Sequence, residues 1–259
     1  MATYTATARN FAAASENKIH SDEIAQRFGF TGALVPGVAV FGHLSAPLTQ
    51  RYGERWLTRS WVTTRFLKPA YDGDTLSLTD SEGDMQSISV ECRNAAEIVL
   101  ATATCTLEST QPEPAPQAYV RGSGPPASRT EITWEAVRLN EPFATYSWQP
   151  DMIHNLEYAA RVEDDAPLFG DGVLHPHAIL SQANQALVRR FIMPAWIHTG
   201  SEIRFRKLLR VDDAIEVRAV PIDKWERRGH QFLKLYVAYA LTDEIATEVF
   251  HTAIFRVAG

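Results

Sequence analysis

One pattern occurs twice in this chain of 259 residues, and this repetition most restricts what the chain can fold into. Pro36 and His175 each precede an apolar, helix-like segment, and Arg65 and Arg204 lie in the strand-like segments that follow. Both pairs of residues are 139 positions apart. A constant offset across a helix and the next strand predicts two copies of one folding unit, with a ligand pocket at the seam between the copies.

Composition excludes several classes of protein. A net charge of −6 and a pI near 5.8 argue against a nucleic-acid-binding protein, whose binding face is usually basic. Cys92 and Cys105 match no metal-ligand or disulfide spacing, so we expect buried free thiols and no metal. Residues 1–9 have no apolar core of signal-peptide length, and no segment is long enough to span a membrane. We therefore expect a soluble cytoplasmic protein.

A proline-rich segment divides the chain. Residues 109–130 contain five prolines and two glycines, and proline at this density blocks both helix formation and sheet pairing. We therefore predict an N-terminal unit over residues 1–108, a linker over residues 109–130 and a C-terminal unit over residues 131–259.

Each unit is expected to hold one enclosed helix followed by four strands. The helices are predicted at 38–52, where Pro47 should cause a kink or a break, and at 177–191. A shorter helix should begin after Ser21, a residue suited to the N-cap. The strands are predicted at 61–68, 75–81, 85–93 and 98–107, and again at 197–208, 214–224, 231–241 and 247–257.

A helix wrapped by an antiparallel sheet is the hotdog arrangement. The predicted fold class is therefore α+β, a tandem (double) hotdog in which the two sheets join edge to edge. Such joining removes two exposed strand edges that would otherwise favour aggregation. Two chains can pair further through their sheets, which would give a homodimer.

Six segments carry a resemblance to a known family. They are residues 17–22 (NKIHSD), 32–37 (GALVPG), 66–69 (FLKP), 72–76 (DGDTL), 164–169 (DDAPLF) and 194–198 (PAWIH). With these segments the chain resembles the double-hotdog members of the MaoC-like hydratase/dehydratase family over nearly its whole length, the linker excepted. The resemblance implies hydration of a 2-enoyl thioester or dehydration of a 3-hydroxyacyl thioester. The implied partner is an acyl-CoA or carrier-protein thioester, and no cofactor is needed besides water.

The family motif places an Asp five residues before a His, and the pair holds one water for proton transfer. A backbone N–H at a helix N-terminus polarises the thioester carbonyl. In the first unit the resemblance assigns the histidine to His20 and the N–H to Gly37. Ser15 stands at the aspartate position, and the adjacent Glu16 is the alternative carboxylate.

In the second unit Asp164 matches the aspartate, but Phe169 stands at the histidine position and Pro176 replaces the glycine. Because neither unit holds the full set, three interpretations stay open. His20 can work with another acid, such as Glu16 or a residue reached across the seam. Both sites can have decayed, leaving an acyl-CoA-binding or scaffold protein. The pocket can serve another reaction, such as thioester hydrolysis or a biosynthetic dehydration or cyclisation. We favour the first.

Further residues are candidates for substrate binding. They are Pro36, His43, Arg65, Lys68, His175 and Arg204. An arginine fork suits the phosphates of a CoA-type ligand, although a solvated strand face is the simpler interpretation for the basic residues. For His43 the simpler interpretation is a hydrogen-bonded core histidine. Ser45 and Asn184 occupy equivalent helix positions, where a polar residue either contacts the pocket or bonds to the sheet.

Overall fold

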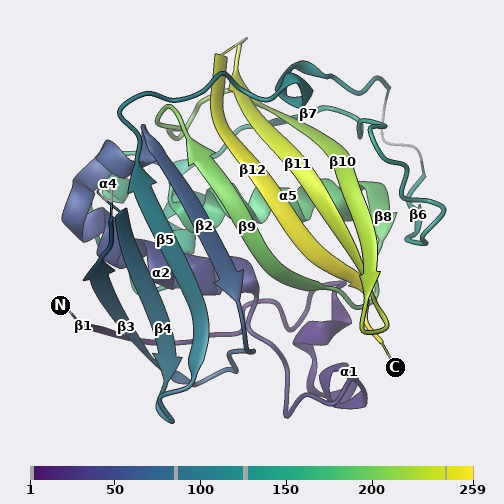
Figure 1. The fold of residues 1–259 in the computed structure, drawn as a ribbon, viewed down its shortest axis with the longest axis horizontal. Coiled ribbons are helices and arrows are strands. Elements are labelled where there is room, and N and C mark those ends of the chain that lie inside the picture. The colour runs from purple at the N-terminus through teal and green to yellow at the C-terminus, as the bar shows by residue number, and fades with distance from the viewer. Residues whose placement is uncertain (1–2, 85–86, 125–127, 243, 259) are drawn as a thin grey trace.

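The computed structural model describes residues 3–84, 87–124, 128–242 and 244–258 (Figure 1). Met85 of one predicted strand and Pro125 and Pro126 of the predicted linker lie outside these residues. Ten strands form one antiparallel sheet. Its first half contains, in spatial order, β1 (Thr3–Thr7), β3 (Thr75–Glu82), β4 (Ser87–Asn94), β5 (Val99–Leu107) and β2 (Ser60–Phe66). Its second half contains β9 (Ile197–Phe205), β12 (Glu244–Arg256), β11 (His230–Leu241), β10 (Ile215–Arg227) and β7 (Tyr146–Trp148).

The two halves of the sheet have the same topology. Counted from its outer edge, the first half runs β1-β3-β4-β5-β2 and the second runs β7-β10-β11-β12-β9. They join where β2 pairs with β9 in antiparallel register, from Ser60 opposite Phe205 to Arg65 opposite Gly200. The predicted α+β double hotdog, with edge-to-edge joining of two copies, is therefore confirmed.

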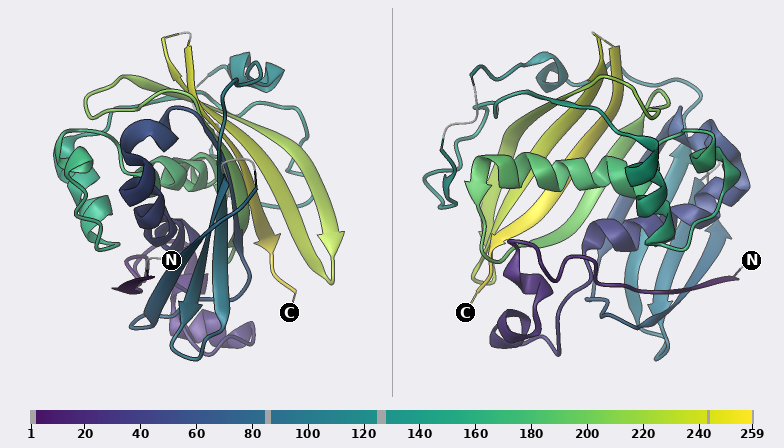
Figure 2. Two further views of the ribbon diagram at one scale, coloured as in Figure 1. Left: turned by 60° about the vertical axis from the view of Figure 1, so that its left-hand side comes forward. Right: turned by 180° about the vertical axis from the view of Figure 1, so that it is seen from behind.

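Two long helices lie side by side on one face of the sheet (Figure 2). They are α2 (Gly37–Tyr52) and α5 (Pro176–Arg190). Both are buried on most sides, as with Phe41 and Leu44 of α2 and Leu187 of α5, because the sheet wraps around them. The helix α2 runs unbroken through Pro47, so the predicted break does not occur. Burial of the flanking residues outweighs the single backbone hydrogen bond that proline removes.

Several shorter elements were not predicted from the sequence. They are β6 (Thr130–Glu131), β8 (Phe191–Ile192), α3 (Met152–Ala160), α4 (Pro167–Gly170), η1 (Lys18–His20), η2 (Gly53–Leu57) and η3 (Pro116–Tyr119). The helix α1 (Asp22–Arg27) begins after Ser21 as predicted, but the Ser21 hydroxyl donates to the Lys18 carbonyl and does not cap the helix. The preceding 3-10 turn places that carbonyl within reach.

The segment after β5 crosses the face of the sheet that the helices leave uncovered. Ala118 of η3 packs against Tyr236 and Ala238 there, and its carbonyl accepts a hydrogen bond from Arg218. Ala115 donates its backbone N–H to the carboxylate of Glu248. These contacts anchor the segment to the outer face of the second half.

Cys92 and Cys105 are free and buried, as predicted, and burial raises the pKa of both thiols to about 12. Within the described ranges, no helix combines the length and the apolar character that a membrane span requires.

The close crossing of α2 and α5 gives a stability prediction. A Cβ atom on Gly42 would lie 2.8 Å from Cγ1 of Val162 and 3.1 Å from Cβ of His177. Gly42→Ala is therefore expected to lower the free energy of unfolding by about 1–3 kcal/mol, despite the better helix propensity of alanine. The measurement is urea unfolding. Gly170→Ala is the matched control, because a Cβ at Gly170 would meet no atom within 4 Å. Equal stability of Gly42→Ala and the natural protein would contradict the prediction.

Candidate active site

Two cavities meet beside the predicted catalytic histidine. The larger has a volume of about 800 Å³ and the smaller about 200 Å³. Both are lined by Asn17, His20, Pro36, Asn184 and Trp196. The first three belong to the first half of the chain and the last two to the second, so the cavities lie at the seam between the halves.

The hydrogen bonds of His20 assign its tautomer. Its Nδ1 lies 2.6 Å from the carbonyl oxygen of Leu34, which can only accept, so Nδ1 carries the proton. Its Nε2 lies 3.2 Å from Nδ2 of Asn17. The backbone of Trp196 fixes the Asn17 amide, because its N–H donates to Oδ1 at 3.1 Å and its carbonyl accepts from Nδ2 at 3.0 Å. The amide nitrogen therefore faces His20 and donates to the Nε2 lone pair.

Burial lowers the pKa of His20 below the usual histidine value, and the Leu34 carbonyl opposes this shift only in part. A neutral imidazole that lines both cavities can accept a proton at Nε2 once the hydrogen bond from Asn17 is released. His20 is held in this place by η1, which begins directly after Asn17.

Ser15 and Glu16 line the larger cavity, but neither gives a carboxylate to His20. The Ser15 hydroxyl lies 3.4 Å from the Asn17 carbonyl. The Glu16 carboxylate accepts two hydrogen bonds from Arg129, at 3.0 and 2.5 Å. This hydrogen bonding to Arg129 lowers the pKa of Glu16, which keeps the group ionised. Among the described residues, no carboxylate is hydrogen-bonded to His20.

Gly37 is the first residue of α2 and lines the smaller cavity. The N–H groups in the first turn of a helix have no partner within the helix, and they lie at the positive end of its dipole. A Cβ at Gly37 would lie 3.1 Å from Nδ1 of His198 and 3.2 Å from the Phe66 ring, which explains why glycine stands here. Lys68 lines the same cavity, as does Pro36.

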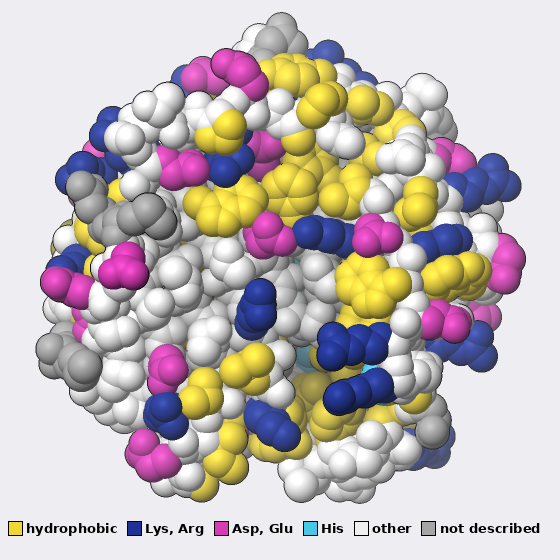
Figure 3. Space-filling view, in the orientation of Figure 1, with side chains coloured by type: hydrophobic (Ala, Val, Ile, Leu, Met, Phe, Trp, Pro, Cys, Tyr) yellow, Lys and Arg dark blue, Asp and Glu magenta, His cyan; other side chains and the backbone are white. Residues whose placement is uncertain are grey.

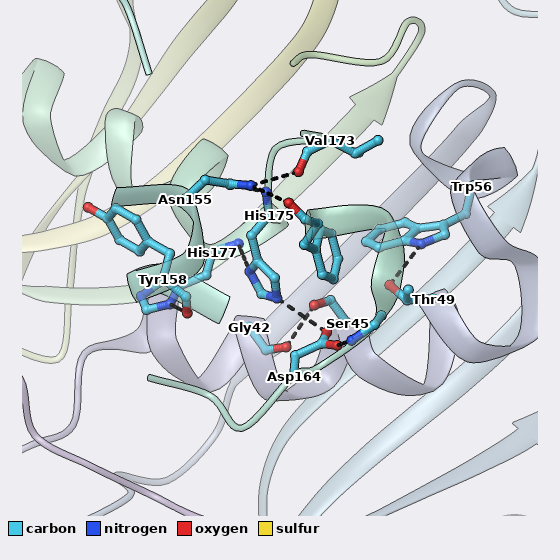
Figure 4. A network of polar contacts seen from close by, with 12 residues as sticks. Gly42, Ser45, Thr49, Trp56, Asn155, Tyr158, Asp164, Val173, His175 and His177 are labelled. Carbon is cyan, nitrogen blue, oxygen red and sulfur yellow. Dashed lines mark hydrogen bonds and ion pairs between the residues drawn. The ribbon is translucent and has the colours of Figure 1, made fainter. Parts of the chain in front are cut away.

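In the second copy of the motif, Asp164, Phe169 and His175 line neither cavity. Figure 4 shows Asp164 and His175 in a network of polar contacts with His177, which does line the larger cavity. Nε2 of His175 lies 3.2 Å from the Asp164 carboxylate, and both side chains are buried. The backbone N–H of His177 donates to Nδ1 of His175, so the proton of this ring lies on Nε2 and points to Asp164. Phe169, which stands at the histidine position, is 1% exposed and packs on the His175 ring at 4.4 Å between centroids. Asp164 is therefore a buried partner of His175.

His43 lies in the same core, away from both cavities. It is 1% exposed, and neither ring nitrogen makes a hydrogen bond of good geometry with any residue that the structure describes. Burial, followed by the proximity of His175, lowers its pKa to about 4. The core interpretation fits His43 better than a substrate contact, although its nitrogens do not find the expected partners.

The two predicted phosphate ligands on the central strands lie on the outer face of the sheet, opposite the helices. Arg204 bonds to the Glu108 carboxylate at 3.2 and 3.3 Å and lies over the Trp61 ring. Arg65 lines a separate outer groove with Lys234. Basic and hydrophobic side chains gather on this face (Figure 3). Alternation along β2 and β9 turns these positions away from the cavities.

The structure thus brings part of the predicted site together. The cavities are lined by Ser15, Glu16, His20, Pro36, Gly37 and Lys68. They are not lined by His43, Arg65, Asp164, His175 or Arg204. Of the paired helix positions, Asn184 lines both cavities, whereas the Ser45 hydroxyl donates to the Gly42 carbonyl. Trp196 and His198 were not predicted as site residues. Their segment contributes to the family resemblance, but no residue pattern in it indicates a catalytic or binding role.

No protein-family model and no curated protein sequence matches the chain. Solved structures do match. A protein of Chloroflexus aurantiacus J-10-fl described as a MaoC-domain dehydratase superposes with a TM-score of 0.68 at 12% identity, over 100% of this chain and 95% of that one. Rv0216 of Mycobacterium tuberculosis, described as having a double hotdog fold, gives 0.62 at 13% identity, over 98% and 95%. A Lactobacillus plantarum protein described as an oleoyl thioesterase gives 0.55 at 12% identity, over 100% and 97%.

At these identities the likeness shows a common fold. The chain is a double-hotdog protein, with the architecture that the MaoC-like dehydratases have. Its candidate site lies where the two hotdog units meet.

Proposed function

We propose that the protein hydrates a 2-enoyl thioester or dehydrates a 3-hydroxyacyl thioester, with His20 as the acid/base. The observation that carries this proposal is the neutral, buried His20, which lines both cavities beside the N-terminus of α2. A base next to a carbonyl-polarising N–H is what proton abstraction from the α-carbon of a thioester requires.

In the dehydration direction, the substrate first displaces the Asn17 N–H from Nε2 of His20, and the freed lone pair takes the proton from the α-carbon. The electron pair moves toward the thioester carbonyl, whose oxygen gains negative charge and is stabilised by the Gly37 N–H. The 3-hydroxyl group then leaves as water with the proton returned by the His20 imidazolium, and the double bond forms. Hydration is the reverse. A single imidazole thus moves the proton in both steps, which fits a site without a carboxylate on His20.

The charges of the two cavities indicate how the thioester lies. The larger cavity has Arg129, Arg161 and Arg189 in its wall and only Glu16 as an acid, so its balance is positive. Such a wall suits the phosphates of CoA or of a carrier-protein phosphopantetheine arm. The smaller cavity is walled by apolar groups such as Phe66, Leu34 and Ile197, which suit a short acyl group. The thioester then lies at the junction, between His20 and Gly37.

Hydrolysis of the thioester is the second candidate. The absence of a carboxylate on His20 among the described residues favours hydrolysis as well. One neutral base and one carbonyl-polarising N–H suffice to direct water at a thioester carbonyl. A similar solved structure is also described as a thioesterase.

One experiment separates these functions. The purified protein is mixed with crotonyl-CoA, and loss of the enoyl absorbance is followed beside release of free thiol. Loss of absorbance without thiol supports hydration, and thiol release supports hydrolysis. If neither occurs over a series of chain lengths while acyl-CoA binds, the protein is a binding module and the enzymatic proposal is wrong.

The ion pair of Glu16 gives a second prediction. Because Arg129 holds this carboxylate ionised, it cannot deliver a proton near neutral pH. Glu16→Gln is therefore expected to change kcat by less than about tenfold, below the usual contribution of an acid/base group. The measurement is steady-state kinetics on crotonyl-CoA. A loss of about a hundredfold or more would show that Glu16 is the missing acid.

A further inference from the structure

A chain of buried polar groups from the second half reaches the smaller cavity, and the reaction above does not use it. His198 of β9 is 6% exposed and lines this cavity together with Gly37. Its Nδ1 is buried and makes no hydrogen bond of good geometry with a described residue. The same atom lies 3.1 Å from the position of a Cβ on Gly37, so it stands directly beside the first residue of α2.

The other ring nitrogen of His198, Nε2, contacts a buried hydroxyl. Its Nε2 lies 2.9 Å from Oγ of Ser201, and this hydroxyl lies 3.2 Å from Nδ1 of His251. The two imidazoles stack with centroids 4.0 Å apart. Ser201 and His251 are both buried, and Nε2 of His251 has no hydrogen-bond partner in the described part of the chain.

The direction of this chain decides whether Nδ1 of His198 donates or accepts. If His198 donates to Ser201, and Ser201 to His251, the proton of His251 lies on the buried Nε2 and has no acceptor. In the opposite direction His251 donates to Ser201, and Ser201 donates to Nε2 of His198. Each direction leaves one N–H of the pair unsatisfied, but in the second it is Nδ1–H of His198, beside the smaller cavity, where the oxygen of a ligand can accept from it. The second direction places the remaining proton on Nδ1 of His198, at the cavity.

Both rings are neutral. Burial, followed by the charge of the neighbouring ring, lowers the pKa of His198 well below the usual value, and the Gly200 backbone opposes this shift only in part. Burial lowers the pKa of His251 to about 3. A neutral imidazole N–H can donate a hydrogen bond without transferring its proton, which suits a group that polarises a carbonyl.

We propose that Nδ1–H of His198 is a second donor to the thioester carbonyl oxygen, beside the N–H of Gly37. Ser201 and His251 are positioning residues that fix the tautomer. The inference rests on the proposed thioester chemistry and names the residue through which the second copy completes the site of the first. The inference also gives the second copy a role although its own motif is buried. Its strand β9 supplies a hydrogen-bond donor to the site of the first copy.

The test measures hydrogen bonding to the thioester carbonyl in a bound ligand that does not react. Butyryl-CoA labelled with ¹³C at the thioester carbonyl is bound to the protein, and the C=O stretch is measured by infrared difference spectroscopy. A hydrogen-bond donor lowers this frequency. His198→Phe keeps an aromatic ring against Phe66 but removes the donor, and is expected to lose a large part of the downshift. His198→Asn, whose amide N–H lies near the position of Nδ1, is expected to retain most of it.

Ser201→Ala should give an intermediate downshift, because Nε2 then has no donor and the tautomer is no longer fixed.

With crotonyl-CoA, His198→Phe is expected to lower kcat by about 100- to 1,000-fold with little change in KM. His154→Phe is the control, because this ring is exposed and lines neither cavity. Circular dichroism establishes that each variant is folded.

The outcomes separate the two proposals. Binding of butyryl-CoA with an equal downshift in the natural protein and in His198→Phe overturns the role of His198 and leaves the proposed function in place. Binding with no downshift at all overturns both the role of His198 and the carbonyl-polarising role of the Gly37 N–H in the proposed function. Failure of every acyl-CoA to bind overturns the proposed function and this inference together.

Discussion

Replacing His20 with alanine is expected to lower kcat for crotonyl-CoA hydration by about 10²–10⁴-fold, the usual contribution of an acid/base group. The reason is that no described carboxylate contacts the imidazole, so no second group can take over the proton. The substrate should still bind, because the Gly37 N–H and the wall of the larger cavity remain. Steady-state kinetics and a direct binding measurement together test this expectation.

His154→Ala is the control for this variant, since the His154 side chain is 69% exposed and lines neither cavity. It should have the kinetics of the natural protein. A His20→Ala protein that binds and turns over crotonyl-CoA at the natural rate would remove His20 from the mechanism.

The pH dependence follows from the same histidine. In the dehydration direction His20 must be neutral to act as the base, and burial lowers its pKa below the ordinary value of 6.5. The value of kcat/KM should therefore be level around neutral pH and fall only as the pH drops through that lowered pKa. A rate that already falls with decreasing pH above 6.5 would show that another group acts as the base.

The second large effect concerns stability. His175→Ala is expected to lower the free energy of unfolding by about 3–5 kcal/mol, because it leaves the buried Asp164 carboxylate with only the Ala166 N–H as a donor and opens a cavity in the core. The Asp164 side chain is only 5% exposed. The substitution also removes the acceptor that caps α5, since Nδ1 of His175 accepts from the His177 N–H. Urea unfolding gives both the free energy and the m value.

The exposed pair of His154 and Asp151 is the matched comparison. Its atoms are 2.6 Å apart, yet both side chains are in solvent, so His154→Ala should leave the unfolding midpoint unchanged. Stability of His175→Ala within 1 kcal/mol of the natural protein would contradict the structural role that we assign to the second motif. Asp164→Asn completes the test, because loss of kcat in a folded variant would return this residue to the reaction.

Much of the fold could be predicted because its signals are local. Apolar spacing marked the two long helices, and β-branched alternation marked most strands of the large sheet. The constant offset between Pro36 and His175 revealed the duplication without any structure. The edge strands β1 and β7 and the helix α3 were missed, because short elements at an edge depend on pairing and packing more than on sequence pattern.

The candidate site was predicted only in part. His20 and Gly37 lie in short segments with a family pattern, so both could be named from sequence. Asn184 could be named as a candidate, since its paired position with Ser45 indicated either a pocket contact or a bond to the sheet. Trp196 and His198 could not be assigned to the site, since nothing near them in the chain indicates what they face across the seam.

By itself the sequence determined the duplication, the α+β double hotdog and the position of one histidine before one helix, since each of these follows from spacing along the chain. Only the tertiary structure decided which polar groups share a cavity. It joined Asp164 to His175 in a closed core, tied Glu16 to Arg129, and set His198 beside Gly37. The physical reason is that hydrogen bonding and burial depend on distance in space, and the pairing of β2 with β9 brings together residues that lie far apart in the chain.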